Sequence, residues 1–446
     1  MARRYFIETY GCQMNVHDSE RMAGLLEAAG YEPAQHEREA DVIIVNTCSV
    51  RERAEDKLYT RLGELRALGA DAQRPVVAVT GCVAQQEGQT ILTRSSVVDV
   101  VLGTQRMKRL PMLLDGAVTR EPDGHPIVDI SPYDDVSFPL GVVRRHDPVK
   151  AYVTIIEGCN EFCSFCVVPY TRGHERMRPK QEILDEIWQA VDAGHTEVHL
   201  LGQIVNHYQA PDEPACDFPA LLEAIHAVTG LRRIRFASPH PRHVTPRMIE
   251  VMRDLPKICR HLHLPVQSGS TRVLTAMRRR HSREEYLTLI ERLRDAIPGV
   301  ALSTDMIVGF PGETVEDFEQ TMSLVRQVRY DSMFSFKYSP RPNTLASQRL
   351  PDAVSEAEKT DRIVALQMLQ REIQLELHEA AIGCEEEVLV DSTSRRRDWE
   401  VSGRTSGNTV VNFPGSADLL GSFVRVQITR AGPNSLSGER VAVGPA

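Results

Sequence analysis

Three apolar segments in the first hundred residues each end in a cysteine. They are RRYFIETYGC, ADVIIVNTC and RPVVAVTGC, and their cysteines are Cys12, Cys48 and Cys82. Continuous apolar runs of this length are typical of strands buried on both faces of a parallel sheet. Amphipathic helical patterns lie between them. The chain therefore begins as an alternating β-α-β-α-β segment, which predicts a parallel sheet covered by helices.

The same pattern predicts that the three cysteines meet. Parallel strands end at one edge of their sheet, and that edge is where open α/β sheets bind ligands. Residues 36 and 34 positions apart in the chain can therefore share a metal site. Zinc is the weaker choice, because a three-cysteine zinc site usually recruits a histidine or keeps a water molecule. His17 is the only histidine near any of the three in sequence.

A second set of three cysteines lies in EGCNEFCSFC. Cys159, Cys163 and Cys166 fall within eight positions, with no fourth cysteine nearby. Structural zinc sites and ordinary iron–sulfur sites usually take four protein ligands. Three ligands leave a coordination position open for something other than the chain.

Six further strand patterns follow, from AYVTIIEGC at 151 to DSMFSFKYSP at 331, with helical stretches between them. Six β-α repeats fall short of a full eight-unit barrel, so we expect a partial (β/α)6 barrel that is open on one side. Parallel barrels carry their sites at the carboxyl ends of their strands, where the first of these six strands leads into the cysteine loop. Polar residues near the ends of other strands outline the same rim: Gln203, Ser238, Gln267 and Asp305.

Composition limits the class of protein. No apolar run approaches the roughly 18 residues of a membrane span, and the start lacks the apolar stretch of a signal peptide, so we expect a cytoplasmic protein. Nine cysteines in 446 residues are too sparse for a disulfide framework, which favours metal binding or catalysis. The net charge of −9 does not indicate a nucleic-acid binder, yet local arginine clusters keep RNA possible as a partner.

The remaining segments complete the expected architecture. Proline-rich and aspartate-rich sequence indicates a linker over 122–148. A long helical stretch over 353–381 precedes short apolar strands separated by Gly, Ser and Asn turns, which predict a small antiparallel barrel. We therefore expect an α/β protein with an amino-terminal domain over 1–121, a barrel domain over 149–379 and a carboxy-terminal domain over 380–446.

The spacing of Cys159, Cys163 and Cys166 after a first barrel strand resembles the radical S-adenosylmethionine (SAM) enzymes. In that superfamily three thiolates hold a [4Fe–4S] cluster, and SAM binds the fourth iron. Reduction of the bound SAM gives methionine and a 5′-deoxyadenosyl radical. The cofactor supplies this chemistry and the protein positions it.

The amino-terminal motifs YGCQMNVHDSE, NTCSVRERAEDK and TGCVAQQ resemble those of the methylthiotransferases within this superfamily. The resemblance covers essentially the whole chain and implies a second [4Fe–4S] cluster, held by Cys12, Cys48 and Cys82. YGCQMN and NTCSVRE are most similar to the branch that acts on isopentenyl-adenosine beside the anticodon of tRNA. Departures from the family pattern are small: Ile204 stands where Asn is expected, and Asn343 where Gly is expected.

The resemblance implies transfer of a methylthio group to C2 of that adenine, with two SAM molecules used for each product. The alternatives are methylthiolation of a ribosomal protein aspartate or of threonylcarbamoyl-adenosine in tRNA. A more distant alternative is an iron–sulfur RNA-binding protein without catalysis. Further partners implied are a sulfur donor and a low-potential electron donor such as flavodoxin or ferredoxin. We expect a monomer.

Residue roles follow from the resemblance and from position. The six cysteines are expected to be catalytic cluster ligands. Expected contacts to SAM come from Phe165, Gln203, Ser238, Gln267 and Asp305, although Phe165 could instead only pack its loop. The carboxy-terminal domain resembles the RNA-binding TRAM domain. Candidate RNA contacts are Arg172, Arg176, Arg178, Arg395, Arg396, Arg397 and Arg404, with surface salt bridges as the alternative for the first three.

Overall fold

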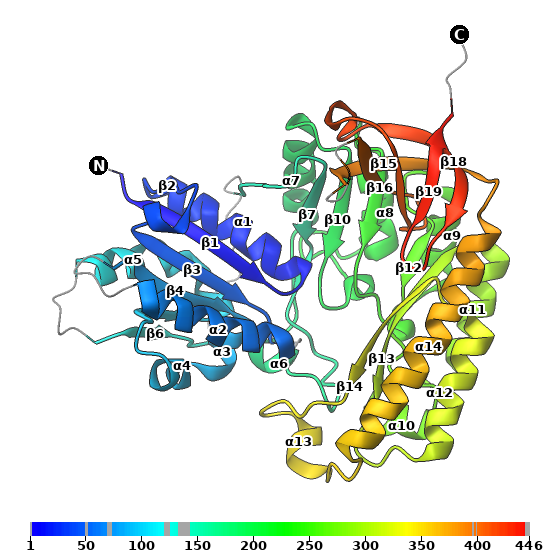
Figure 1. Ribbon diagram of the computed structural model, residues 1–446, viewed down its shortest axis with the longest axis horizontal. Coiled ribbons are helices and arrows are strands. Elements are labelled where there is room, and N and C mark those ends of the chain that lie inside the picture. Colours follow the sequence, from blue (N-terminus) through cyan, green and yellow to red (C-terminus); the bar gives the residue numbers. More distant parts are fainter. Residues whose placement is uncertain are drawn as a thin grey trace.

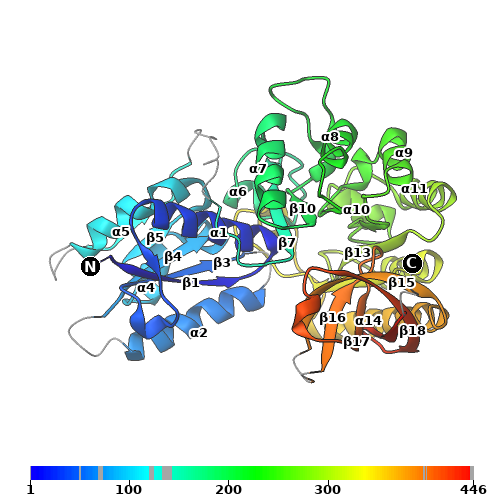
Figure 2. The same cartoon turned by 90° about the horizontal axis from the view of Figure 1, so that it is seen from above.

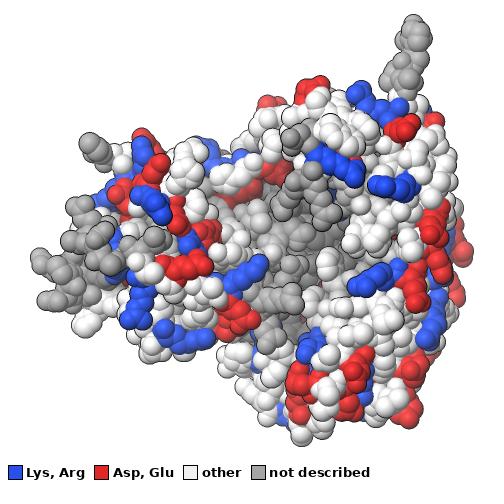
Figure 3. All heavy atoms as spheres, viewed as in Figure 1, with Lys and Arg blue, Asp and Glu red and all other residues white. Residues whose placement is uncertain are grey.

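The computed structural model describes residues 2–49, 52–68, 74–119, 125–132, 143–394, 397 and 399–441. An amino-terminal α/β domain lies beside an open barrel, and a small closed barrel packs against one end of the open one (Figures 1 and 2). No described helix combines the length and apolar character needed to cross a membrane. Positive and negative side chains are mixed over the face in Figure 3 rather than gathered into one basic patch.

The amino-terminal domain is built on a parallel sheet of strand order β2-β1-β3-β4-β5-β6 (Figure 1). The three strands predicted from the cysteine-ending segments are β1, β3 and β4, and they are adjacent. The strand bounds are β1 (Arg4–Tyr10), β2 (Glu32–Pro33), β3 (Val42–Thr47), β4 (Val76–Gly81), β5 (Val100–Leu102) and β6 (Ile127–Asp129).

Helices cover both faces of this sheet. One apolar core joins it to α1 (Gln13–Ala28) and α5 (Leu110–Val118). A second core joins the opposite face to α2 (Glu52–Leu68), α3 (Cys82–Glu87) and α4 (Gln89–Arg94). Two buried faces explain why the strands are continuously apolar rather than alternating.

The expected linker over 122–148 contains a strand. β6 pairs in parallel with β5 through Val100↔Ile127 and Leu102↔Asp129, so it belongs to the amino-terminal sheet. Three residues flanked by proline-rich sequence are too short to give a strand pattern, which is why the sequence does not predict it. Residues 120–124 and 133–142 of this region lie outside the described ranges.

The open barrel has the six predicted strands, in two parallel sheets of order β11-β10-β7 and β12-β13-β14. A parallel bridge between Ile234 of β11 and Ile258, just before β12, links the sheets. The strand bounds are β7 (Lys150–Thr154), β10 (Glu197–Leu201), β11 (Arg233–Phe236), β12 (His261–His263), β13 (Ala301–Val308) and β14 (Ser332–Lys337). A short antiparallel pair, β8 (Ile156–Glu157) with β9 (Arg176–Met177), flanks the cysteine loop.

Helices surround the open barrel: α6 (Val168–Thr171), α7 (Lys180–Asp192), α8 (Phe218–His226), α9 (Pro246–Asp254), α10 (Thr271–Ala276), α11 (Arg283–Ala296), α12 (Val315–Val328), α13 (Leu345–Arg349) and α14 (Glu356–Ala380). The apolar periodicity of α7 predicts that Trp188 faces the core, but Trp188 is exposed. Glu186 is buried in the same helix instead, because basic side chains from other segments surround it.

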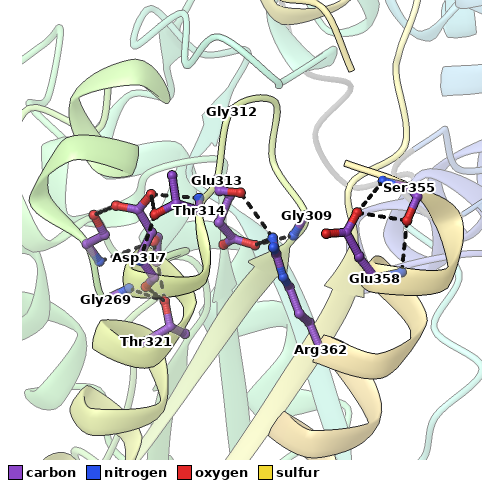
Figure 4. Close-up of polar contacts among 12 residues, drawn as sticks. Gly269, Gly309, Gly312, Glu313, Thr314, Asp317, Thr321, Ser355, Glu358 and Arg362 are labelled. Atoms are coloured by element: carbon purple, nitrogen blue, oxygen red, sulfur yellow. Dashed lines mark hydrogen bonds and ion pairs between the residues drawn. The ribbon is translucent and has the colours of Figure 1, made fainter. Parts of the chain in front are cut away.

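The long helix α14 is fastened to the barrel by the turn after β13 (Figure 4). Arg362 donates to the buried carboxylate of Glu313 at 2.8 Å, and the backbone N–H of Gly309 donates to the same oxygen at 2.6 Å. Thr314 and Asp317 form a capping box that begins α12 immediately afterwards. The GFPGET segment thus ends a strand, begins one helix and holds another.

The carboxy-terminal domain is a closed barrel of order β15-β16-β17-β19-β18 around a small apolar core that includes Phe413, as expected. Its strands are β15 (Glu385–Thr393), β16 (Glu400–Arg404), β17 (Val410–Pro414), β18 (Phe423–Ala431) and β19 (Leu436–Arg440). The pairing is not purely antiparallel, because β17 and β19 run parallel. The strands are too short for the sequence to set their pairing.

This small barrel is attached at the amino-terminal ends of the open barrel's strands. Arg233, the first residue of β11, donates to the backbone carbonyls of Arg404 and Glu387 at 2.8 and 2.7 Å. Arg235 donates to the carbonyls of Thr405 and Ser406 at 2.6 and 3.1 Å. Both arginines are buried, so the contact is a fixed part of the fold.

Candidate active site

The barrel cysteines lie in a loop between β8 and α6. The N–H of Cys159 donates to the carbonyl of Gly173 at 3.2 Å, and the N–H of Cys166 donates to the carbonyl of Cys163 at 3.0 Å. Gly158 has a φ of +74°, and a Cβ there would overlap the backbone of His174. The chain can therefore turn sharply just before its first cysteine only with glycine at that position.

The middle of this loop is fixed by distant backbone. Ser164 donates its N–H to the carbonyl of Met277 at 2.9 Å and its hydroxyl to that of Ala276 at 2.8 Å. Its own carbonyl accepts from the N–H of Ala346 at 2.7 Å. These contacts anchor the middle of the cysteine loop to distant parts of the barrel.

Burial controls the acidity of the barrel thiols. Burial, together with the negative charge of the neighbouring Cys163 thiolate, raises the pKa of Cys159 and of Cys166 to about 12. Arg279 places its Nη1 3.5 Å from the Sγ of Cys163 and donates through Nη2 to the carbonyl of Pro265 at 2.7 Å. Such thiols become thiolates when a cation binds them.

The amino-terminal cysteines meet at one sheet edge, as the strand pattern predicts. Tyr10 pairs with Thr47, and Thr47 pairs with Gly81, so the three loops begin side by side. Cys12 caps α1, Cys48 follows β3, and Cys82 begins α3. At Gly11 a Cβ would overlap the side chain of Cys48, which shows how closely these loops approach.

The amino-terminal thiols differ in acidity. A hydrogen bond with Cys48 lowers the pKa of Cys12 to about 6, with help from the charge of Arg172 and from N–H groups at the start of α1. Burial raises the pKa of the Cys82 thiol, and Arg172 opposes that rise. Cys12 therefore ionises more readily than Cys82.

Two buried asparagines support this edge and were missed by the sequence reasoning. Asn15 Oδ1 lies 3.3 Å from the Sγ of Cys12, and its Nδ2 donates to the side-chain oxygen of Asn46 at 3.1 Å. Asn46 donates in turn to the hydroxyl of Ser19 at 2.9 Å. Both asparagines lie inside the cysteine motifs YGCQMN and NTC, and this position in the sequence could have identified them as supporting residues.

Three arginines proposed for RNA are paired with carboxylates where α1 packs over the barrel. Arg172 donates to Asp18 at 2.6 Å, Arg176 lies 3.4 Å from Glu157, and Arg178 is paired with Glu186. Arg172 and Arg178 are fully buried, so the structure does not offer them to RNA phosphates; Arg176 is partly buried. The amino-terminal domain covers this segment, which is why a basic sequence here is not an exposed basic surface.

The predicted SAM-contacting residues lie along the barrel rim. Gln203 and Ser238 follow the adjacent strands β10 and β11, and the N–H of Gln267 donates to the carbonyl of Asp305 at 2.9 Å. Ser238 and Gln267 both have positive φ, at +59° and +77°. Such strained backbone in residues other than glycine clusters at functional sites. Phe165 is partly buried against a small apolar cluster that includes Phe310 and Tyr338.

The donor sets fit iron–sulfur clusters better than single ions. Within the described ranges, no three His, Cys, Asp or Glu side chains converge closely enough to hold one metal ion. In a [4Fe–4S] cluster each thiolate binds a different iron, so the three sulfurs stand further apart than they do around zinc. Two sets of three thiols, three of the six buried and three partly buried, suit that larger group. The cysteines outside the sets are Cys216 and Cys259, which are buried, and Cys384, which is exposed.

On the carboxy-terminal barrel, the proposed RNA-contacting Arg397 is exposed and Arg404 is partly exposed. Arg397 lies 5.4 Å from the ring centroid of the exposed Trp399 and 3.1 Å from Glu400. Arg404 donates to the carbonyl of Asn408 at 3.1 Å. Arg395 and Arg396 lie outside the described residues.

An open six-stranded barrel with three cysteines after its first strand defines a radical SAM domain, and residues 153–325 match the radical SAM superfamily. Residues 379–441 match the TRAM domain, and residues 4–103 match the uncharacterized protein family UPF0004. The fold resembles that of the radical SAM methyltransferase TsrM from Kitasatospora setae with cobalamin and a [4Fe–4S] cluster bound. The TM-score is 0.57 at 13% identity, and the match covers 87% of this chain and 77% of that one. The cobalamin-dependent radical SAM enzyme OxsB gives a TM-score of 0.53 at 10% identity, covering 83% and 56%.

Curated relatives narrow the class further. The tRNA-2-methylthio-N(6)-dimethylallyladenosine synthase of Yersinia pseudotuberculosis is 45% identical over 98% of this chain and 92% of its own length. The enzyme of the same name from Carboxydothermus hydrogenoformans is 46% identical over 96% and 97%. The chain belongs to this family of radical SAM methylthiotransferases.

Proposed function

We propose that the protein transfers a methylthio group to C2 of N6-isopentenyladenosine (dimethylallyladenosine) at position 37 of tRNA, next to the anticodon, using two SAM molecules for each product. The observation that carries the proposal is the meeting of two three-cysteine sets from different domains. Arg172, six residues after Cys166, pairs with Asp18 on α1, the helix that Cys12 caps, and this buried contact between the two segments supports a single substrate site for both sets. The full-length similarity to enzymes named for this product supports the substrate.

The chain supplies two open-sided thiol sets and the surfaces around them. Cys159, Cys163 and Cys166 would hold one [4Fe–4S] cluster, and Cys12, Cys48 and Cys82 the other. When bound, the clusters supply the electron that splits SAM and an open iron at which sulfur is held. The protein's part is to orient thiolates, SAM and adenine against one another and to keep water from the reacting atoms.

Residues on the barrel rim would orient SAM. The candidates are Phe165, Gln203, Ser238, Gln267 and Asp305, and the unusual positive φ of Ser238 and Gln267 supports a functional role for these two residues. The target base must leave its stack to enter the barrel mouth, as bases do in other enzymes that modify them. Arg397 and Arg404 would contact the RNA backbone away from that mouth.

The reaction also needs partners. A low-potential donor such as flavodoxin or ferredoxin would supply electrons, and a separate sulfur donor would renew the transferred sulfur. The protein would act as a monomer in the cytoplasm, where its tRNA substrate is found.

Mass analysis of tRNA nucleosides tests the substrate and the reaction together. Cells lacking the protein should retain the isopentenyl group and lose the 2-methylthio group, and the wild-type gene should restore it. In those cells, 2-methylthio-isopentenyladenosine could instead stay unchanged while threonylcarbamoyl-adenosine or a ribosomal protein aspartate loses its methylthio group. That result would show that the substrate is a different one. Reconstituted protein should hold about eight irons per chain, four for each cysteine set; a stable yield of four would contradict the two-cluster arrangement.

A further inference from the structure

Each cysteine set has one buried arginine. At the barrel set, Arg279 places its Nη1 3.5 Å from the Sγ of Cys163, and a 2.7 Å hydrogen bond from Nη2 to the Pro265 carbonyl fixes the guanidinium. Its backbone lies between Arg278 and Arg280, which both have positive φ, at +58° and +55°. This strained turn directs Arg279 inward.

At the amino-terminal set, the corresponding side chain comes from the other domain. Arg172 follows α6, six residues after Cys166, and α6 packs against α3, which begins at Cys82. The positive charge of its guanidinium lowers the pKa of both the Cys82 and the Cys12 thiols, and its partner Asp18 lies on α1, the helix that Cys12 caps. Asp18 on α1 accepts from the other side at 2.6 Å, and Gln105 donates to the Arg172 carbonyl at 3.2 Å.

The charge balance gives these arginines a role. A doubly positive [4Fe–4S] core held by three thiolates carries a net negative charge, and reduction adds another electron. Burying that charge is costly unless a positive group lies close by. A guanidinium fixed against a ligand sulfur stabilises the reduced form more than the oxidised form, and therefore raises the reduction potential of that cluster.

We propose that Arg172 and Arg279 are positioning residues that each serve one cysteine set, and that each raises the reduction potential of the cluster bound there. The assignment rests on the proposed function, because it requires both clusters. It places a barrel-domain residue, Arg172, in the environment of the amino-terminal set. The two potentials are then set separately, although the two sites share one interface.

Redox titration followed by electron paramagnetic resonance tests this on full-length, anaerobically reconstituted protein. Each cluster is measured alone, in a background in which the other set's three cysteines are alanine. The comparison is made at the potential at which the amino-terminal cluster of the parent protein is half reduced. At that potential, Arg172→Gln should lower the ratio of reduced to oxidised amino-terminal cluster about tenfold. For a one-electron couple, this change corresponds to a fall of about 59 mV in the reduction potential. Arg279→Gln should do the same to the barrel cluster, and each change should leave the other cluster unaltered.

Conservative and neighbouring variants separate charge from structure. Arg172→Lys and Arg279→Lys should recover most of the ratio, because the charge remains. Arg242→Gln removes an exposed arginine 3.6 Å from Glu161 in the barrel cysteine loop and should change neither ratio. If Arg172→Gln fails to bind iron at its set, Arg172→Lys must bind it with a near-parental ratio; loss of iron in both overturns the proposal.

Unchanged ratios in both Gln variants, or equal shifts of both clusters by either variant, would also overturn it. The wild-type iron content separates this inference from the proposed function. A wild-type protein that assembles only one cluster contradicts the proposed function. If both clusters assemble and their reduction potentials do not change in the Arg172 and Arg279 variants, only this inference is contradicted.

Discussion

At the residue scale, the local environment gives the same side chain different acidities. The pKa of the Cys12 thiol falls to about 6 because Cys48, Arg172 and the start of α1 stabilise its thiolate. The pKa values of Cys159 and Cys166 rise to about 12 because burial outweighs the groups that stabilise their thiolates. The two sets therefore differ before anything binds, and Cys12 offers a ready thiolate at neutral pH.

Substitution of one cysteine in each set should separate the two activities. We expect Cys163→Ala to abolish SAM cleavage, because the barrel set loses a ligand. Cys48→Ala should leave cleavage largely intact and stop methylthio transfer. Chromatography of 5′-deoxyadenosine and mass analysis of the RNA product measure the two steps. Cys384→Ala, an exposed cysteine outside both sets, is the control; loss of both activities in folded Cys48→Ala protein would refute the division.

The carboxyl group of Glu20 should make stability depend on pH. Burial raises its pKa from 4.5 to about 7 in the folded state, against the opposing charge of Arg145. The folded state therefore holds this proton more tightly than the unfolded chain does. The stabilisation is complete below pH 4.5 and is lost as pH rises through 7, on the order of 3 kcal/mol in total.

Glu20→Gln should remove that dependence. Relative to wild type, we expect the variant to gain free energy of unfolding at pH 8 and to gain little at pH 5, measured by urea denaturation of the apoprotein. Glu39→Gln, at a carboxylate near the surface of the same domain, is the control. An equal effect of Glu20→Gln at both pH values would contradict the assigned pKa.

Sequence alone predicts the cysteines better than the arginines. Cys159, Cys163 and Cys166 are close in the chain, and Cys12, Cys48 and Cys82 repeat at the ends of recognisable strands, so local pattern is enough to find them. Arg172 pairs with Asp18 across 154 positions, and only the packing of α1 on the barrel brings them together. That packing turns a predicted RNA contact into an interior residue.

At the element scale, α14 depends on one buried ion pair. Arg362 and Glu313 are both buried, and Glu313 also accepts from the N–H of Gly309 (Figure 4). Removing one partner leaves an uncompensated charge in the interior, which generally costs far more than losing an exposed pair.

We expect Arg362→Ala to lower the free energy of unfolding by about 3–5 kcal/mol. The control is Glu376→Ala on the same helix, whose 2.6 Å pair with Arg329 is exposed and should contribute less than about 1 kcal/mol. Denaturant unfolding followed by circular dichroism measures both. Equal losses in the two variants would show that the Glu313 contact does not hold α14.

Long elements follow from the sequence, and short ones do not. Most of the open-barrel strands have four to eight residues, which is enough for an apolar pattern to appear, and α14 is long enough to be recognised as a helix. β12 has only three residues and is found because the apolar segment HLHLPV continues beyond it. β6 has three residues, and the parallel pairing of β17 with β19 involves two register pairs, so neither leaves a readable pattern. The prediction that Trp188 faces the core is wrong. Apolar periodicity assigns the charged Glu186 to the surface, whereas Glu186 is the residue that is buried in α7.

At the scale of the whole molecule, the TRAM barrel and the rim proposed to bind SAM occupy opposite ends of the open barrel. Arg233 fixes TRAM at the first residue of β11, whereas Gln203 and Ser238 follow the last residues of β10 and β11. The eight residues of β13 span about 26 Å. An RNA that contacts both ends must extend along the side of the barrel.

Substrate length should therefore matter. We expect full-length tRNA to have a lower KM than an isolated anticodon stem-loop carrying the same modified adenine. Changing Arg397 and Arg404 together to alanine should raise the KM of the full tRNA severalfold toward that of the stem-loop and leave kcat nearly constant. Steady-state kinetics with both RNAs tests this, and Arg247→Ala on the open barrel is the control. An equal rise in KM for both RNAs would place these arginines near the base instead.

The packing of α1 on the first strand of the open barrel also bears on biosynthesis. His17 bonds to Thr154 of β7 at 2.7 Å, and Met14 lies 3.9 Å from the same hydroxyl. A ribosome releases α1 well before β7, and domains generally fold as units in that order. When β7 emerges from the ribosome, α1 is therefore already folded. The amino-terminal domain can then act as the surface against which the first strand of the open barrel folds.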